Sequence, residues 1–458
     1  GGKRTRAKRS KNSDDSDENC CPNTSKRKKC EDLPEKAKEA KVDLDQLALG
    51  HEASKELAMS EMGLNEIVED DTYVTSDETP SQSDDTPTKS FQYLEQGRKN
   101  SASPTLGMLV TPEHQTADFF ISRRRHVEGR NHFSRLSDEI LLMIFRWLPK
   151  PTLCKVALVS KQWRQIAYDD TLWSRLDLGK RTLMPRNLEY VLKRGVSILR
   201  LAGTQIPDTV VKPKSTYLPQ NFVSKLQYLD LSMAQITTTG LFELLHTCRQ
   251  LRKLSLENCK LDQRVCEAVG HNASLEALNL SSCEGLTANG LEAILACCTS
   301  LLSLNLAWTC MNAETLETLT TTLPKSVQRL SVAGCRKNLT NEHVKKIVQA
   351  CPNLVEFDVS DCTVITATAV NNIMALLASL EHLSLSRCYG ILPTDFERLN
   401  DSISLIYADI FGVLNESNLN TVRSSLPGVF INKFMFSSIA RPTVGVRRTS
   451  IWGLRVRD

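Results

Sequence analysis

The sequence of 458 residues lacks any apolar run long enough to cross a membrane. Its longest uninterrupted apolar stretches, such as the one from Ile140 to Phe145, are far shorter than the roughly 20 residues that a membrane-spanning helix needs. No signal-peptide pattern opens the chain. We therefore expect a soluble intracellular protein of two or three domains, with no membrane as a partner.

Motifs that carry catalysis or bind metals are also absent. The sequence contains no Cys-x-x-Cys pair for a zinc site, no P-loop and no His-Glu-x-x-His motif. Its eight histidines are scattered, without a nucleophile placed to act with them. These absences predict a protein that is not an enzyme and holds no metal and no cofactor, so that any chemistry has to come from its partners.

Charge is unevenly distributed near the amino terminus. Residues 1–30 contain ten Lys or Arg against four Asp or Glu, whereas residues 31–90 contain five against seventeen. Such blocks repel themselves and rarely fold alone. With few aromatic residues nearby, they predict a disordered regulatory tail over residues 1–130.

Two kinds of short signal occur in this tail. Basic clusters at residues 3–9 and 26–29 suit a nuclear import receptor or nucleic acid, and we favour import because no aromatic residue is interleaved for base stacking. We therefore expect a nuclear protein, with the cytoplasm as a second compartment. Four pairs resemble proline-directed kinase sites: Thr79-Pro80, Thr86-Pro87, Ser103-Pro104 and Thr111-Pro112.

A repeated strand pattern, L-x-x-L-x-L-x-x-C, occupies the second half of the chain. Start-to-start distances are 30, 25, 24, 26, 26, 27, 26 and 25 residues, and all but the first fall in the range typical of leucine-rich repeats. Clear copies begin at Leu251, Leu275, Val327, Leu354 and Leu380, and weaker ones at Val196, Leu226, Leu301 and Leu405.

Between the strand patterns lies a helical one, with apolar residues at i, i+3, i+4 and i+7. It is clearest in the segments that begin at Leu241, Leu291 and Val344. Strand and helix therefore alternate, and stacked units share a core that no single unit can form. This predicts an α/β fold, a leucine-rich-repeat solenoid over residues 177–430 with parallel strands on the concave face and helices on the convex face.

The fifteen cysteines are an odd number and too thinly spread for a disulfide scaffold. At least eight of them fall at two equivalent repeat positions, one closing the strand motif and the other ending the helix. We expect these cysteines to be small buried hydrophobes.

Residues 131–176, which precede the repeats, have a different sequence pattern, that of a small helical unit. Ser137 is placed to cap a first helix, which Pro149 ends. Pro151 suits the first turn of a second helix, and Trp163 with Ile166 marks a third. So small a unit is near the limit of independent stability, so its apolar surface predicts an external partner. A helical cap on the end of the solenoid is the alternative.

The run from Leu136 to Leu141, with Phe145, Leu148 and matching residues up to Trp173, resembles the F-box family, although Ser137 stands where that family usually has proline. The resemblance implies docking on the S-phase kinase-associated adaptor, which joins F-box proteins to a cullin and, through it, to a RING subunit. The residues expected to face the adaptor are Leu136, Ile140, Leu141, Ile144, Phe145, Leu148, Leu153, Val156, Val159, Trp163, Leu172 and Trp173.

The resemblance extends over roughly residues 130–458. The stretches 336–339, 383–389, 439–445 and 451–453 are similar to the S-phase kinase-associated F-box proteins, the substrate receptors of a cullin ligase that degrades cyclin-kinase inhibitors. This implies a non-catalytic ubiquitin-ligase subunit that captures phosphorylated cell-cycle regulators for proteasomal degradation. A leucine-rich-repeat scaffold that binds partners without ubiquitin transfer is the alternative.

One column of residues lies two positions after the last apolar residue of each strand motif, where we expect side chains to point off the rim, away from the core. It comprises Met233, Asn258, Ser282, Trp308, Gly334, Asp361 and Arg387. Tryptophan and arginine are common interface hot spots, although any one of these residues alone is an ordinary surface residue. Thr309 stands in the usual cysteine position, which sets the turn at Trp308 apart.

The resemblance implies that matching positions face a phosphorylated substrate and a small cyclin-kinase-subunit accessory protein. The last segment, residues 431–458, breaks the repeat period, and the resemblance implies that it folds back along the concave face. An unstructured basic tail is the alternative. The residues expected to bind substrate or accessory protein are Trp308, Arg336, Asp361, Arg387, Tyr389 and Phe436.

Overall fold

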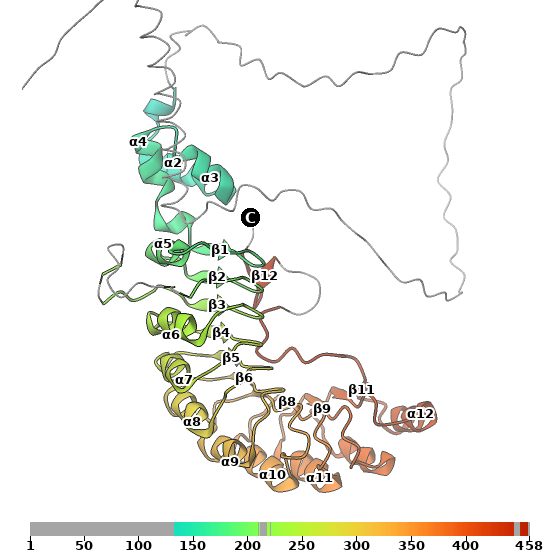
Figure 1. The fold of residues 1–458 in the computed structure, drawn as a ribbon. Helices are drawn as coiled ribbons and strands as arrows, with labels where there is room; N and C mark the ends of the chain where they lie inside the picture. Colours follow the sequence, from blue (N-terminus) through green and yellow to red (C-terminus); the bar gives the residue numbers. More distant parts are fainter. Residues whose placement is uncertain (1–131, 209, 211–217, 220, 444–448, 457–458) are drawn as a thin grey trace, which may run out of the picture. The chain divides into compact units, whose positions relative to one another are not determined.

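The computed structural model describes residues 132–208, 210, 218–219, 221–443 and 449–456 (Figure 1). The predicted tail over residues 1–130, with its basic clusters and its Ser-Pro and Thr-Pro pairs, lies outside the described residues. Within the described part, no helix has both the length and the apolar character that a membrane crossing requires.

Eleven short strands form one parallel sheet in the described part of the chain, and they follow one another in sequence order. The middle residue of most strands is a fully buried leucine that pairs with the middle residue of the next strand, as Leu229 does with Leu254. The strands are β1 (Arg175–Asp177), β2 (Ile198–Arg200), β3 (Tyr228–Asp230), β4 (Lys253–Ser255), β5 (Ala277–Asn279), β6 (Ser303–Asn305), β7 (Arg329–Ser331), β8 (Glu356–Asp358), β9 (His382–Ser384), β10 (Tyr407–Asp409) and β11 (Phe430–Ile431).

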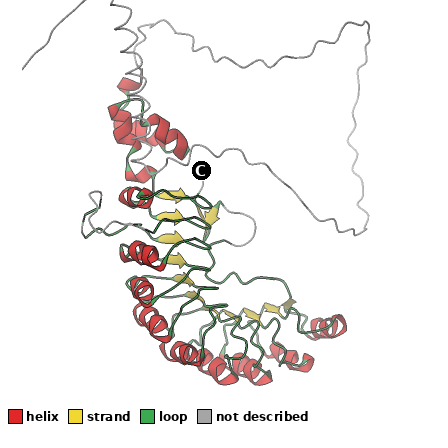
Figure 2. Cartoon of the chain, viewed as in Figure 1, coloured by secondary structure: helices red, strands yellow, loops and turns green. Residues whose placement is uncertain are grey.

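The helices between these strands lie together on one side of the sheet, as Figures 1 and 2 show. Most begin after a Thr, Asp or Asn side chain that accepts a backbone N–H of the first turn, as Thr287 Oγ1 does from Gly290 at 3.1 Å. The elements are α5 (Asn187–Lys193), α6 (Thr238–His246), α7 (Gln263–Gly270), α8 (Ala288–Cys297), α9 (Ala313–Thr322), α10 (Asn341–Ala350), α11 (Ala367–Leu376), the 3-10 helix η3 (Pro393–Asp401) and α12 (Glu416–Ser425).

The predicted solenoid is confirmed. Each strand pattern, including the weak copies, corresponds to a strand, from β2 after Val196 to β10 after Leu405. The helical residues Leu241, Leu291 and Val344 are fully buried beneath the sheet. The sheet also reaches one strand into each neighbouring segment, since β1 crosses the predicted boundary at 176/177 and β11 the one at 430/431.

The repeat cysteines are buried, as predicted, and connect neighbouring repeats. Cys283 Sγ donates to the Leu256 carbonyl at 3.0 Å, and Cys388 Sγ donates to the Val359 carbonyl at 3.2 Å. Burial raises the pKa of the Cys388 thiol to about 12, so this group stays a protonated donor at neutral pH. These buried thiols are therefore part of the hydrophobic core of the repeats.

Residues 132–173 form the predicted helical unit, with a core around Trp173, whose indole Nε1 donates to the Ala167 carbonyl at 2.7 Å. Two details differ from prediction. Ser137 precedes the first helix, but its hydroxyl bonds the Glu139 carboxylate, lowering the pKa of that group, and caps no backbone N–H. That helix ends before Pro149, which instead precedes the second helix. The elements are η1 (His132–Arg135), α2 (Asp138–Phe145), α3 (Lys150–Val156), α4 (Lys161–Ala167) and η2 (Asp170–Leu172).

Two further strands, β12 (Ser450–Ile451) and β13 (Leu454–Arg455), form an antiparallel pair separate from the main sheet. Ile451 of this pair is fully buried in a small cluster with Ile198 of β2. The last described part of the chain therefore packs against one of the first repeats.

Candidate functional site

Helix α2 is apolar on two opposite faces. Leu141 and Phe145 point into the core of the helical unit and are at most 2 % exposed. A second set lies at i, i+3, i+4 and i+7; its first three members share one face of α2, the fourth lies in the turn that directly follows the helix, and all are 41–89 % exposed. We call this set the α2 outer face; it consists of Ile140, Met143, Ile144 and Trp147.

The residues predicted to face an adaptor divide according to burial. Side chains that are 0–5 % exposed build the core and offer no free surface in this conformation; they are Leu141, Phe145, Leu153, Leu172 and Trp173. Four others are partly buried against that core, namely Leu136, Leu148, Val156 and Trp163. Ile140, Ile144 and Val159 are exposed. Sequence reasoning missed Met143 and Trp147, because every residue from Ile140 to Phe145 is apolar and spacing alone does not separate the two faces of the helix.

The predicted rim column has one backbone conformation throughout. All seven residues have positive φ, from 57° at Ser282 to 80° at Gly334, because each lies in the tight turn that follows its strand. A left-handed residue in that turn directs its side chain off the sheet, and all seven residues are exposed or half-buried. The column therefore runs along one edge of the repeats.

Trp308 keeps this conformation although its turn differs from the others. Thr309 fills the cysteine position, is buried, and donates to the Leu306 carbonyl at 2.7 Å. The next residue, Cys310, also has positive φ and is exposed. The Trp308 ring lies over Gly334, where a Cβ atom would come within 2.5 Å of the ring. The Arg336 guanidinium stands 5.6 Å from the centre of the same ring.

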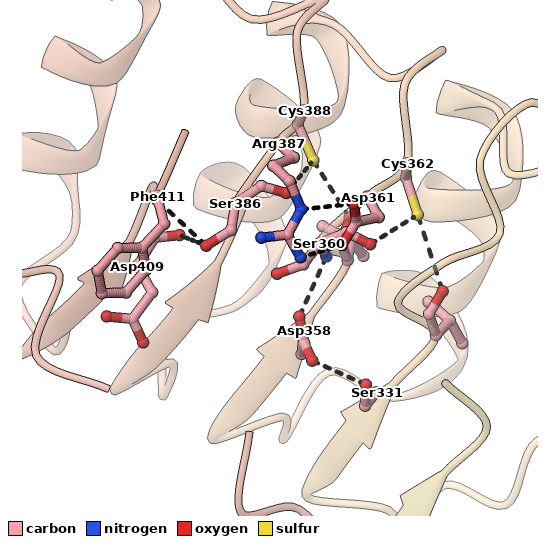
Figure 3. Close-up of polar contacts among 12 residues, drawn as sticks. Ser331, Asp358, Ser360, Asp361, Cys362, Ser386, Arg387, Cys388, Asp409 and Phe411 are labelled. Atoms are coloured by element: carbon pink, nitrogen blue, oxygen red, sulfur yellow. Dashed lines mark hydrogen bonds and ion pairs between the residues drawn. The ribbon is translucent and has the colours of Figure 1, made fainter. Parts of the chain in front are cut away.

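Asp361 and Arg387, neighbours in the rim column, form a two-pronged ion pair (Figure 3). Arg387 Nε donates to Asp361 Oδ1 at 2.6 Å, and Nη2 donates to Oδ2. This bonding raises the pKa of the Arg387 guanidinium. A cavity of 610 Å³ beside the pair is lined by Arg336, Asp361 and Tyr389, among others. Five of the residues predicted to bind substrate or accessory protein thus lie after four consecutive strands, β6 to β9; they are Trp308, Arg336, Asp361, Arg387 and Tyr389.

The C-terminal segment crosses the strand face in the reverse order of the repeats. The Phe434 amide donates to Asp409 of β10 at 3.1 Å. Ile439 then packs on Ala277 of β5, and its carbonyl accepts from Asn305 of β6 at 3.0 Å. Figure 1 shows the segment passing across this side of the sheet.

Trp452 attaches the end of the segment to Ala440, earlier in the same segment, and to Tyr228 of the sheet. The indole Nε1 donates to the Ala440 carbonyl at 3.1 Å, and the ring packs against Tyr228 of β3 at 6.4 Å. Arg441, just after Ala440, forms an ion pair of 3.6 Å with Glu257 near the end of β4. Phe436, predicted to bind the accessory protein, is 73 % exposed and lies between the attachments at Phe434 and Ile439.

The exposed side chains of the α2 outer face and of the rim are of the kinds found at protein interfaces. Within the described residues, no three His, Cys, Asp or Glu side chains are grouped so that they could hold a metal ion. The exposed groups are apolar on α2 and mixed aromatic, cationic and anionic along the rim. Such surfaces suit protein partners, because aromatic and arginine side chains contribute most to protein interfaces.

Comparisons with known proteins define first a class and then a family. Residues 133–179 match the F-box-like family, so that the chain combines an F-box-like unit with a leucine-rich-repeat sheet. Residues 186–458 match the family described as the SKP2 LRR domain. The chain belongs to this SKP2 LRR domain family.

Two curated relatives have both F-box and LRR-repeat in their names. F-box/LRR-repeat protein 4 of Bos taurus is 24 % identical over 286 residues, which cover 60 % of this chain and 46 % of the relative. F-box/LRR-repeat protein 12 of Homo sapiens is 26 % identical over 138 residues, which cover 28 % of this chain and 40 % of the relative. This chain thus spans less than half the length of either relative.

One solved structure with a similar chain is described as the crystal structure of the Rad7 and Elc1 complex in yeast. The similarity covers 66 % of this chain and 91 % of that chain, with 15 % sequence identity and a TM-score of 0.41.

Proposed function

We propose that the protein is the substrate-recognition subunit of a ubiquitin ligase of the adaptor, cullin and F-box type. In this proposal the adaptor joins it to the cullin and the RING subunit, and the protein itself has no catalytic role. Its substrates are phosphorylated cell-cycle regulators such as cyclin-dependent kinase inhibitors. The observation that carries the proposal is the α2 outer face, set in a unit that matches the F-box-like family.

The α2 outer face requires a partner on energetic grounds. Each large apolar side chain that a partner buries contributes roughly 1.5–3 kcal/mol, whereas leaving four of them in water on one short helix and the turn after it forgoes that stabilisation. The opposite face of α2 already fills the core, so the helix cannot turn the exposed set inward without unfolding the unit. A partner with an apolar groove resolves this conflict.

The rim supports capture of a phosphorylated or acidic segment. Arg336, Trp308 and the Arg387–Asp361 pair place cationic and aromatic groups beside a cavity, and guanidinium groups form strong paired bonds with phosphate and carboxylate. Phe436, exposed on the C-terminal segment, supplies an apolar contact for the small accessory protein. We propose that substrate and accessory protein meet here.

Adaptor binding tests the carrying observation. Ile144→Asp with Trp147→Asp places charge on the α2 outer face without touching the core, so the variant should fold and lose the adaptor in a pull-down with purified components. Leu302→Asp is the matched control, because Leu302 is a comparably exposed apolar residue in the repeats. Normal adaptor capture by the double variant would mean that this face is not the docking surface. The non-ubiquitin scaffold would then be the better explanation.

Substrate capture tests the rim separately. Arg387→Ala should weaken binding of phosphorylated substrate by about tenfold while sparing the adaptor, since arginine is enriched among the few interface residues whose truncation costs more than about 1 kcal/mol. Arg387→Lys should rescue little, because lysine keeps the charge but not the two-pronged geometry. Equal capture of substrate by the parent and by both variants in a titration would refute the assignment of Arg387.

We further propose nuclear localisation, directed by the basic clusters at residues 3–9 and 26–29, which lie outside the described residues. Replacing the four basic residues at 26–29 and the five at 3–9 by alanine should move a fluorescent fusion to the cytoplasm. An unchanged nuclear signal would reject these clusters as the import signal.

A further inference from the structure

The carboxylate of Asp409 is bonded differently from those at the equivalent strand ends. Asp230 and Asp358 each accept the backbone N–H two residues further on in their own turn. In the turn after β10 this N–H belongs to Phe411, and it donates to Ser386 Oγ at 3.2 Å instead (Figure 3). Asp409 Oδ1 is thereby left to accept the Phe434 amide of the C-terminal segment at 3.1 Å.

Side chains of two strands reinforce this contact. Asp409 is 2 % exposed, and its Oδ2 lies 2.7 Å from His382 Nε2 of β9, so the buried carboxylate has a polar partner on each oxygen. The rings of His382 and Tyr407 pack against the Phe434 ring at 5.5 and 5.1 Å between centroids. The segment is therefore held at Phe434 by a hydrogen bond and by two aromatic contacts.

A second attachment lies at the same strand position four strands earlier. Asn305 ends β6 and is fully buried; its Oδ1 accepts the Ala307 N–H of its own turn, and its Nδ2 donates to the Ile439 carbonyl at 3.0 Å. Among the described residues, no hydrogen bond joins residues 435–438 to the strands between these two points. Met435 and Phe436 are 72 % and 73 % exposed.

We propose that Asp409, supported by His382, and Asn305 are positioning residues that hold residues 435–438 as a bridge between two anchors and so present Met435 and Phe436 to the accessory protein. The inference rests on the proposed function, in which Phe436 contacts that protein. Binding to a flexible segment requires ordering its side chains and backbone, and fixing both ends of a four-residue bridge beforehand removes much of that cost. The anchors thus act on affinity without touching the partner.

Amide hydrogen exchange tests the anchor directly. Asp409→Ala removes the acceptor, so exchange in the peptide containing residues 434–439 should become at least about tenfold faster. Asp409→Asn keeps an acceptor oxygen and should restore slow exchange. Asp358→Ala is the matched control: it removes the equivalent strand-end carboxylate, which bonds Ser331 and Ser360 but not the segment, and should leave exchange at 434–439 unchanged.

His382→Phe provides a second, independent variant, because it retains ring packing on Phe434 while removing the polar partner of Asp409. Exchange at 434–439 should also rise in this variant, with the thermal melt of the repeats showing that the sheet is intact. Slow exchange in both Asp409→Ala and His382→Phe would overturn the anchor.

Affinity for the purified accessory protein tests the positioning role. Asp409→Ala should weaken binding by about tenfold, as should Phe436→Ala, and Asp409→Asn should bind like the parent. Faster exchange without loss of affinity would overturn positioning. If the parent itself fails to bind the accessory protein, the proposed partner is wrong and the presentation role falls with it, whereas the exchange data still decide whether the anchors exist.

Discussion

At the scale of single residues, the turn after each strand explains the rim column. After β3, β5, β6 and β8 a strand-end Asp or Asn accepts the N–H two residues on, as Asp358 does from Ser360, and in every turn of the column the rim residue takes positive φ. Counting from the buried leucines therefore predicted which side chains leave the sheet. It could not predict that Asp361 and Arg387 pair, because pairing depends on the offset between neighbouring repeats.

Gly334 is the rim position most sensitive to substitution. Its φ is 80°, and an added Cβ atom would meet the Trp308 ring at 2.5 Å. We expect Gly334→Ala to cost about 1–2 kcal/mol in the free energy of unfolding from backbone strain alone, and to displace Trp308. Urea unfolding followed by tryptophan fluorescence measures both effects.

A double-mutant cycle separates the two causes in Gly334→Ala. Adding Trp308→Ala removes the ring and should recover the part of the cost that comes from the clash, leaving only the strain. Gly453→Ala is the control for strain alone, since Gly453 has a φ of 79° and no atom lies within 4 Å of an added Cβ atom. Strict additivity of the Gly334 and Trp308 substitutions would contradict the proposed contact.

At the scale of elements, periodicity identifies the buried face of the repeat helices but not the buried face of α2. A repeat helix such as α10 has one apolar stripe and a polar remainder, so its buried face can be identified from spacing alone. In α2 every residue from Ile140 to Phe145 is apolar, so spacing cannot distinguish the inward face from the outward one. The assignment of Leu141 and Phe145 to the core needed the positions of α3 and α4.

The helix starts make a prediction at this scale. Thr287 caps α8 through its hydroxyl, which accepts the Gly290 N–H at 3.1 Å. Thr287→Ala should lower the free energy of unfolding by about 1 kcal/mol, because that N–H loses its protein acceptor, whereas Thr287→Ser should be close to neutral. Urea denaturation followed by circular dichroism gives the difference. Equal losses for alanine and serine would show that the cap hydrogen bond is not the cause.

At the scale of the whole repeat array, the C-terminal segment adds contacts that adjacent repeats cannot make. Each repeat contacts mainly its neighbours, so the stability of a solenoid is close to a sum of local terms. The segment instead connects β10 through Asp409, β6 through Asn305 and β2 through Ile451. Its path could not be derived from periodicity because the attachments are single residues at irregular intervals. The family resemblance supplied the expectation of a folded-back course.

Removing the segment should therefore change the cooperativity of unfolding as well as its midpoint. A chain ending after Lys433 keeps β11 and the Asn432 side chain that accepts the Ile410 N–H, but loses the attachments to β10, β6 and β2. We expect a lower urea midpoint and a broader transition, with the first repeats, which lose their contacts with Ile451 and Trp452, unfolding before the last.

Trp452→Ala should reproduce part of the effect and Phe436→Ala none, because Trp452 is attached to Ala440 and Tyr228 whereas Phe436 faces solvent. Superimposable unfolding curves for the shortened and parent chains would mean that the segment lies on the sheet without stabilising it, and that neighbouring repeats alone determine how the array unfolds.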